Sequence, residues 1–409
     1  MTYKKNISPL KDLAKFKYGK FLSKANLDKS GYPVFSGYGI VGYLPTYEYS
    51  EKQLLIVCRG EGGTGDVKLS PSKCSITNLS IVITPYENII TKKFLYWALK
   101  TIDTYKLRTG SAQAQITIEA LNNLVVEYPF SISYQNQITK ILDYYDGRID
   151  LLKQTNKTLE SIAQAIFKSW FVDFDPVHAK QQGVECAGID KATADLFPDS
   201  FEESEQGWIP TGWTIKQLKD IAVRHVEKIK NVVDWENEYL IDLSRIDSKT
   251  LFNINNGFGK ELTTSVTKFV KGDILFGAIR PYFHKVTIAN LNGVTNISVF
   301  VIRPSVDFYH EYLASLMFRE STVDFSVRLS KGTKMPVISW SDLSTLKITL
   351  APECIIKKYS EIISPLIKKG IENSALINSL TSTRDALLPR LISGKINLSN
   401  IEDELEGIA

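Results

Sequence analysis

One long stretch of regularly spaced apolar residues constrains this chain more than any other feature. Between Gln135 and Phe171, mostly apolar side chains recur at alternating steps of four and three residues. That spacing forms one stripe along an α-helix and is typical of a coiled-coil seam. The stripe consists of Leu142, Tyr145, Ile149, Leu152, Asn156, Leu159, Ala163, Ile166 and Trp170. A helix about 55 Å long cannot bury such a stripe alone, so we expect a partner helix. A long core helix in one globular domain is the alternative.

Four sequence segments before and within this helix recur later in the chain in the same order. LKDLA at Leu10 returns as LKDIA at Leu218, and TNLS at Thr77 returns as TNIS at Thr295. LRTGSAQAQITIEALNNLVV from Leu107 parallels LSKGTKMPVISWSDLSTLKI from Leu329, and SIAQAIFKSW parallels STRDALLPRL. Four matches in one order indicate an internal duplication.

The duplication supplies a second helix with its own, weaker seam. Its positions are Ile363, Leu366, Gly370, Asn373, Ile377, Leu380, Arg384, Leu387 and Leu391. Pro365 predicts that this helix either starts near Ser364 or is kinked there, and Pro389 with Gly394 predicts its end. Antiparallel pairing of the two helices would bring Asn156 and Asn373 together at the centre, where a polar pair fixes the register.

The pattern predicts an α+β chain with an internal pseudo-two-fold repeat. Short apolar runs separated by Gly, Pro, Asn and Ser clusters indicate strands in each repeat. Two mixed α/β modules should therefore alternate with two long helices that pair as an antiparallel coiled coil. The expected boundaries are 1–134 for the first module, 135–172 for the central helix, 173–210 for a linker, 211–353 for the second module, 354–396 for the C-terminal helix and 397–409 for a tail.

Charge and cysteine content limit the class of protein only weakly. A net charge of +4 and a pI near 8.6 permit an anionic partner without requiring one. The four cysteines form no CxxC pair and no disulfide pattern, which fits a reducing compartment. No apolar run is long enough to span a membrane, and the first residues lack a hydrophobic signal core. We therefore expect a cytoplasmic protein.

Motifs for catalysis are weak throughout the sequence. GEGGTG at Gly60 to Gly65 satisfies GxGxxG, but the following DVKLSPSKC has no helical period, so we interpret it as a glycine-rich turn between strands. Pro198-Asp199 has no lysine at the spacing of a nuclease site, and Asp175-Pro176-Val177 only partly matches an amino-methyltransferase signature. The four histidines show no metal-ligand spacing, and we predict no catalytic and no metal site.

A polar loop before the last strand of each module is the better signal. Cations, glutamines and hydroxyl residues there are side chains that hydrogen-bond base edges in duplex DNA. The candidates in the first module are Arg59, Arg108, Thr109, Ser111, Gln113 and Gln115. In the second module they are Arg328, Lys331, Thr333 and Lys334, together with a second set on a short loop at Pro281, which is Arg280, Tyr282, His284 and Lys285. A solvated hairpin tip is the alternative for any single residue, and repetition in both modules favours the binding loop.

Three further segments point to a known family. They are LESIAQAIFKSWFVDFDPVHAK from Leu159, GIDKATADLFPDSFEESEQGWIPTGW from Gly188 and TSTRDALLPRLISGKI from Thr381. These segments resemble the specificity subunit of type I restriction-modification enzymes, and the resemblance covers essentially the whole chain. It implies a non-catalytic, sequence-specific DNA-binding subunit in which each module is a target recognition domain. Each domain would read one half of a bipartite DNA target, with the paired helices setting the distance between halves.

The resemblance also implies partners and cofactors. Modification (methyltransferase) subunits, two in number, would dock on the helices, and restriction (endonuclease) subunits would join through them. S-adenosylmethionine, ATP and magnesium would belong to those partner subunits, with no cofactor in this chain. We assign partner docking to the aromatic residues Phe167, Trp170, Phe171 and Phe174, which exceed what one seam requires.

Two other hypotheses remain open at this point. One is a stand-alone DNA methyltransferase or nuclease with a divergent catalytic site. The other is a structural coiled-coil protein whose modules bind protein or carbohydrate. Salt-dependent binding to duplex DNA would distinguish the structural coiled-coil protein from the specificity subunit and from the methyltransferase or nuclease.

Overall fold

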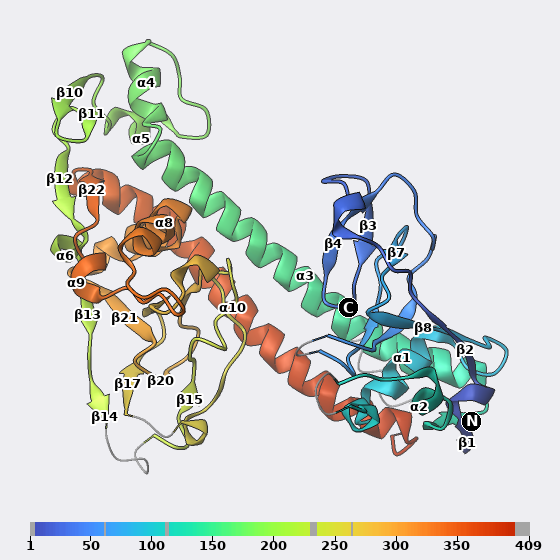
Figure 1. Ribbon diagram of the computed structural model, residues 1–409. Helices are drawn as coiled ribbons and strands as arrows, with labels where there is room; N and C mark the ends of the chain where they lie inside the picture. The colour runs from blue at the N-terminus through green and yellow to red at the C-terminus, as the bar shows by residue number, and fades with distance from the viewer. Residues whose placement is uncertain (1–4, 61–62, 111–113, 230–234, 263–264, 397–409) are drawn as a thin grey trace. The chain divides into compact units, whose positions relative to one another are not determined.

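The computed structural model describes residues 5–60, 63–110, 114–229, 235–262 and 265–396 (Figure 1). The chain divides into two compact units, residues 1–148 with 380–409 and residues 149–379, which we call unit 1 and unit 2. Helices α3 (Ile132–Phe171) and α10 (Glu353–Ile392) contribute residues to both units. The tail expected at 397–409 lies outside the described residues. Within the described ranges, no helix has the length and apolar character needed to cross a bilayer.

Unit 1 contains three small sheets. In one, β1 (Lys5–Pro9) pairs antiparallel with β9 (Val125–Pro129). The second has the order β2 (Ala14–Tyr18), β8 (Ser80–Pro85), β5 (Leu54–Val57), β6 (Val67–Leu69), all antiparallel. The third has the order β4 (Ile40–Leu44), β3 (Tyr32–Phe35), β7 (Ser75–Ile76). The helical elements are η1 (Leu10–Asp12), η2 (Lys24–Asn26), α1 (Lys92–Lys100), η3 (Thr104–Leu107) and α2 (Ile118–Asn122).

Unit 2 repeats this plan with additions. Its first sheet pairs β12 (Thr214–Gln217) with β22 (Lys347–Leu350). The second has the order β13 (Ala222–His225), β21 (Val299–Pro304), β18 (Ile274–Gly277), β19 (Val286–Ile288). The third has the order β14 (Lys228–Ile229), β17 (Val266–Phe269), β20 (Gly293–Thr295), β15 (Tyr239–Leu240), β16 (Gly257–Phe258). The helical elements are α6 (Leu218–Ile221), η5 (Gly259–Glu261), η6 (Pro281–Phe283), η7 (Asp307–Tyr309), α7 (His310–Phe318), α8 (Glu320–Leu329) and α9 (Trp340–Leu343).

The internal duplication predicted from the sequence is confirmed by these sheets. In each module the first strand pairs with the last strand before a long helix, as β1 does with β9 and β12 with β22. The repeated leucines make the same bond: the Leu10 amide donates to Leu124 O at 2.7 Å, and the Leu218 amide donates to Leu346 O at 2.8 Å. Both leucines are fully buried. The fold class expected from the sequence is therefore the observed one.

The segment between α3 and the second module contains more structure than its sequence suggested. It includes α4 (Asp175–Gln181), α5 (Lys191–Asp195) and a hairpin of β10 (Phe201–Ser204) with β11 (Gly207–Pro210). Lys180 Nζ donates to the carbonyl of Phe197 at 2.6 Å, and the Phe197 ring contacts Trp170. No period was visible in the sequence because each of these elements is seven residues or shorter.

The helix bounds correct two expectations. Helix α3 begins at Ile132, three residues before the predicted start, and α10 runs without interruption from Glu353 through Pro365 and Pro389. A start near Ser364 is therefore wrong. Ile355, Ile356, Tyr359 and Ile363 are fully buried before the proline, and this apolar burial offsets the backbone bond that Pro365 cannot make. Gly394 follows the helix at φ +69°, the left-handed conformation typical of a helix end.

The predicted seam lies along the buried side of both helices. All nine seam positions of each helix are buried or half-buried. In unit 1, Leu142 shares a core cluster with Leu387, Leu388 and Leu391, and Arg384 forms an ion pair with Asp146. In unit 2, Leu159, Ile166 and Leu366 pack against the core that contains Ala163 and Ile363. Ile149 and Ile377 are buried, and Leu152 and Leu380 are half-buried.

Two buried asparagines join the helices inside unit 2, at the positions where the antiparallel pairing predicts them. Asn373 Nδ2 donates to Asn156 Oδ1 at 2.9 Å. Asn156 Nδ2 in turn donates to Gly370 O at 3.2 Å and to Ser374 Oγ at 3.3 Å. Satisfied amides of this kind specify register, because a shift along the helix would leave them buried and unpaired.

The aromatic block at the end of α3 is mostly buried. Phe167, Trp170 and Phe171 are at most 5% exposed and belong to the core of unit 2. Their rings contact Tyr312 of α7 and Tyr359 of α10, and Phe174 packs on Trp213. The assignment of Phe167, Trp170 and Phe171 to partner docking is therefore wrong, because residues of the second module and of α10 cover them. Phe174 is half-buried, and its assignment stays a prediction.

A loop of the second module contacts both long helices. Glu160 of α3 accepts hydrogen bonds from the amides of Leu251 at 2.7 Å and Phe252 at 3.2 Å. The Phe252 ring lies against Gly370 of α10, where a Cβ atom would come within 2.5 Å of the ring. Glycine at this seam position is therefore required by the close approach of an aromatic ring. Burial raises the pKa of the Glu160 carboxyl from 4.5 to about 7, although the two amides favour its ionised form.

We expect the Asn373→Leu variant to be less stable than the wild type, because Asn156 Oδ1 would be buried without its donor. The expected loss in free energy of unfolding is about 1–3 kcal/mol, measured by urea denaturation of the full chain. The double variant Asn156→Leu/Asn373→Leu should recover most of the loss. Glu372→Ala, at an exposed neighbouring position, is the matched control and should change little. Equal stability of the single variant and the control would contradict this role for the pair.

The raised pKa of Glu160 predicts a pH dependence of stability. The folded state holds the carboxyl proton up to about pH 7, whereas the unfolded state releases it near pH 4.5. The contribution of the protonated Glu160 carboxyl to the free energy of unfolding is therefore fully present below pH 4.5. It is lost as pH rises through 7, and the loss is up to about 3 kcal/mol. Glu160→Gln keeps an acceptor for the two amides but cannot ionise, so its stability should fall less between pH 5 and pH 8. A constant difference between variant and wild type across that range, in urea denaturation, would show that Glu160 does not titrate in this way.

Candidate nucleic-acid interface

The predicted loop of the first module is fastened at both of its ends. Thr109 and Gln115 form a β-bridge, with N–H to O distances of 2.8 and 2.9 Å, and Gln115 forms a second bridge with Arg59. Gly110 stands at φ +92°, a conformation that favours glycine and turns the chain at the start of the loop. Arg108, Thr109 and Gln115 are exposed. The predicted residues Ser111 and Gln113 lie in 111–113, outside the described residues.

The two arginines of this region are held in different ways. Arg108 Nε donates to Thr64 O at 2.6 Å, and its guanidinium lies 4.3 Å from the centre of the Tyr105 ring. Arg59 lies two residues after the end of β5, with its guanidinium 5.7 Å from the Tyr18 ring. The Nε of Arg59 is buried and has no hydrogen-bond partner among the residues that the structure describes. The residue as a whole is half-buried.

The second module contains the same loop in the same place. Lys331 and Val337 form a β-bridge, and Val337 forms a second bridge with Ile279, directly after β18. Gly332 stands at φ +101°, matching Gly110 of the first module. Lys331, Thr333 and Lys334 are exposed, and Lys331 Nζ lies 3.7 Å from Asp342. The loop predicted from the sequence repeat is therefore present in both modules. In each copy, one β-bridge joins the two ends of the loop, and a second joins the loop to the residues that follow a central strand.

This arrangement brings together two sets of residues that were distinct in the sequence. The Arg280 amide donates to Pro336 O at 2.7 Å, which places the Arg280 loop directly beside the 331–337 loop. Arg280 Nε, like that of Arg59, is buried and has no hydrogen-bond partner in the described part of the chain. Tyr282 is exposed. Arg328 is exposed on α8, outside the loop itself.

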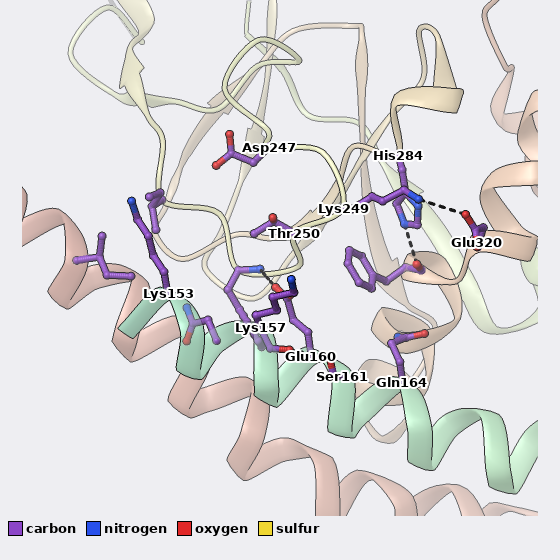
Figure 2. A pocket seen from close by; sticks show the side chains of 15 residues that line it. Lys153, Lys157, Glu160, Ser161, Gln164, Asp247, Lys249, Thr250, His284 and Glu320 are labelled. Carbon is purple, nitrogen blue, oxygen red and sulfur yellow. Dashed lines mark hydrogen bonds and ion pairs between the residues drawn. The ribbon is translucent and has the colours of Figure 1, made fainter. Parts of the chain in front are cut away.

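His284 and Lys285 need correction as candidates for base contact. His284 is 6% exposed, and its Nε2 lies 2.8 Å from the carbonyl oxygen of Phe318 (Figure 2). Burial lowers the pKa of its imidazole, so the ring is neutral at pH 7. Lys285 is half-buried, and its Nζ donates to Leu243 O at 2.7 Å. Both side chains support the loop from inside and are not free to reach a base.

The glycine-rich motif at Gly60 to Gly65 is a connection between β5 and β6. Glu61 and Gly62 lie outside the described residues, and β6 follows the motif where a dinucleotide site would need a helix. The Thr64 hydroxyl donates to Gly60 O at 2.8 Å, and a Cβ atom at Gly60 or Gly63 would come within 2.6 Å of Tyr38. The interpretation as a turn between strands is confirmed. In the second module the corresponding connection is the Arg280 loop.

A separate cleft of about 680 Å³ lies in unit 2 between α3 and the loop from Asp247 to Ile254 (Figure 2). Lys153, Lys157 and Lys249 line it, but so do Asp247 and Glu320, and Lys249 Nζ pairs with Glu320 at 3.2 Å. Charges of both signs in one cleft give no uniform field for a polyanion. Sequence reasoning missed this cleft because the lining comes from segments about 90 residues apart with no shared motif.

Metal-binding groups are also absent from this interface as far as it is described. Across the described ranges, no three His, Cys, Asp or Glu side chains come together as potential metal ligands. The available chemistry is therefore hydrogen bonding, cationic charge and aromatic surface.

Comparisons with known proteins agree with the sequence resemblance. A family model described as the type I restriction modification DNA specificity domain matches residues 4–161. The type I restriction enzyme MjaIX specificity subunit of Methanocaldococcus jannaschii is 26% identical over 339 residues, covering 77% of this chain and 73% of that protein. The HindI specificity subunit of Haemophilus influenzae is 26% identical over 370 residues, covering 77% and 80%.

The fold also matches a solved structure. The crystal structure of the type I restriction-modification system S subunit from M. genitalium has a TM-score of 0.59 and 17% sequence identity, covering 96% of each chain. This likeness concerns the fold alone. The family model over residues 4–161 and the two relatives make this chain similar to type I restriction-modification specificity subunits.

Proposed function

We propose that this chain reads a bipartite sequence in duplex DNA, one half with each module, as the specificity subunit of a type I restriction-modification complex. One observation carries the proposal: both modules present a polar loop that is closed by the same pair of β-bridges, Thr109 and Arg59 with Gln115, and Lys331 and Ile279 with Val337. To read two unlike half-targets, a chain needs two binding loops on the same supporting structure, each with different side chains.

The chemistry of the exposed loop residues fits base and phosphate contact. Arginine and lysine hydrogen-bond guanine O6 and N7, and glutamine can pair with adenine. Arg59, Thr109 and Gln115 are available for this in the first module, and Arg280, Lys331 and Lys334 in the second. Arg59 and Arg280 are half-buried and follow the corresponding strands of the two modules, β5 and β18.

Partner assembly forms the second part of the proposal. We infer that the chain has no catalytic role of its own and docks modification subunits, and through them restriction subunits, which bind S-adenosylmethionine, ATP and magnesium. The buried part of the aromatic block is not available for this contact. Leu151 and Ile162 of α3 are 54% and 42% exposed and are apolar side chains that a partner could cover. The competing hypothesis of a catalytic site in one module gains no support from Gly60 to Gly65, which joins two strands.

The proposal predicts separable effects on the two half-targets. With cognate modification subunits co-expressed, genome-wide mapping of methylated adenines should give a two-part motif with a fixed gap for the wild type. Arg59→Ala should relax the motif in one half only, and Lys331→Ala/Lys334→Ala in the other half only, because a lost base contact costs about 1–3 kcal/mol of discrimination.

Lys369→Ala is the matched control, since Lys369 is an exposed lysine on α10 outside both loops. It should leave the motif unchanged. A one-part motif for the wild type, or loss of both halves together in either loop variant, would contradict separate reading by the two modules.

A further inference from the structure

The turn between β18 and β19 has an unusual backbone. Arg280 stands at φ +49° and His284 at φ +51°, on either side of the short helical turn Pro281–Phe283. The left-handed conformation is unfavourable for residues with a Cβ atom and persists only where surrounding structure imposes it. Two such residues flanking one turn therefore indicate a conformation that the fold maintains against a local preference.

Three contacts hold this turn rigidly. His284 Nε2 lies 2.8 Å from Phe318 O, with its ring centre 5.1 Å from that of Phe318. At the other flank, the Arg280 amide donates to Pro336 O at 2.7 Å. Pro281 is buried, and Lys285 Nζ bonds Leu243 O just after the turn. The turn is thus anchored to α7, to the 331–337 loop and to the loop after β15.

The anchored turn presents two aromatic rings outward. Tyr282 and Phe283 are 51% and 44% exposed, with ring centres 4.7 Å apart. The neighbouring loop adds two exposed apolar side chains, Met335 and Val337. The same loop also contains the exposed residues Lys331 and Lys334. Exposed aromatic rings can stack on bases, and neighbouring cations can contact the phosphates beside them. Burying the apolar surface in this way is more favourable than leaving it in water.

The corresponding connection of the first module, between β5 and β6, has no aromatic residue among its described positions. The corresponding connection contributes Gly60, Gly63, Thr64 and Gly65. Tyr38 packs against Gly60 and Gly63 there, and its hydroxyl donates to Arg59 O at 3.2 Å. Tyr38 is 41% exposed, but it comes from a different segment of the module and is not paired with a second ring on this connection. The two modules therefore differ in the connection that follows β5 in the first and β18 in the second, although the structures around these connections correspond.

We propose that Tyr282 and Phe283 act as an aromatic wedge that stacks on bases and partly opens one base step, in the half-target read by the second module only. This inference rests on the proposed function and names how that module engages duplex DNA. Apolar side chains inserted at a base step unstack it, and the cost is offset by ring stacking and by closer contact of the surrounding cations with phosphates. No such opening is expected in the half read by the first module.

The test uses the full chain assembled with its modification subunits and duplexes that carry 2-aminopurine at successive positions of the mapped target other than the methylated adenines, because a methyltransferase flips its target base out of the stack. Fluorescence of 2-aminopurine rises when the base loses its stacking. The wild type should raise it at one step in the second module's half-target and not in the other half. Tyr282→Ala/Phe283→Ala should abolish the rise and weaken binding about tenfold or more. Tyr282→Phe should retain the signal, since it keeps the ring.

Trp208→Ala is the matched control, because Trp208 is a highly exposed aromatic residue on the β10–β11 hairpin of the same unit. It should leave the fluorescence unchanged, and thermal melting should show that the double variant is folded. A wild-type complex that binds its target with no fluorescence rise, or a double variant that keeps the rise, would overturn the wedge while leaving the proposed function intact. Failure of the wild type to bind any duplex would overturn both.

Discussion

The buried amide pair between the two long helices is the interaction on which the rest of unit 2 depends. Asn373 and Asn156 satisfy each other inside an apolar seam, which fixes how far one helix is displaced along the other. That register brings Gly370 opposite the Phe252 ring and leaves Glu160 in reach of the Leu251 and Phe252 amides. The loop of the second module is thereby attached to both helices at once. A slip by one turn would break the amide pair, the glycine contact and the carboxylate cap together.

A duplicated scaffold with unlike loops explains how one chain could read two different half-targets. The supporting bonds are the same in both modules, from the buried leucine at the start of each repeat to the paired bridges that close each polar loop. What differs is the connection beside the loop: a glycine-rich turn packed against Tyr38 in the first module, and an anchored turn with exposed rings in the second. Sequence change concentrated in such connections alters recognition without disturbing the core.

Much of the fold was predictable from the sequence because it depends on periodicity and repetition. Seam residues such as Asn156 and Asn373 occupy regular positions, and the repeats identify each module's first and last strands. Burial of the aromatic block was not predictable, since Trp170 is covered by α10 and by Phe197, which are distant in sequence. His284 looked like a binding residue for the same reason: only the fold places Phe318 O beside it. Glu160 carried no signal at all, because its partners are backbone amides about 90 residues away. Pro365 misled because its local penalty is outweighed by tertiary burial.

The central claim is that each module reads its own half and that the helix pair sets the gap between halves. Inserting seven residues into α3 after Arg148 and seven into α10 after Ser379, at the boundaries of the two compact units, keeps the seam in phase and adds about 10 Å to each helix. Mapping of methylated adenines for this variant should show both half-targets unchanged and the gap longer by about three base pairs. An unchanged gap with full methylation, or altered bases in either half, would contradict the account.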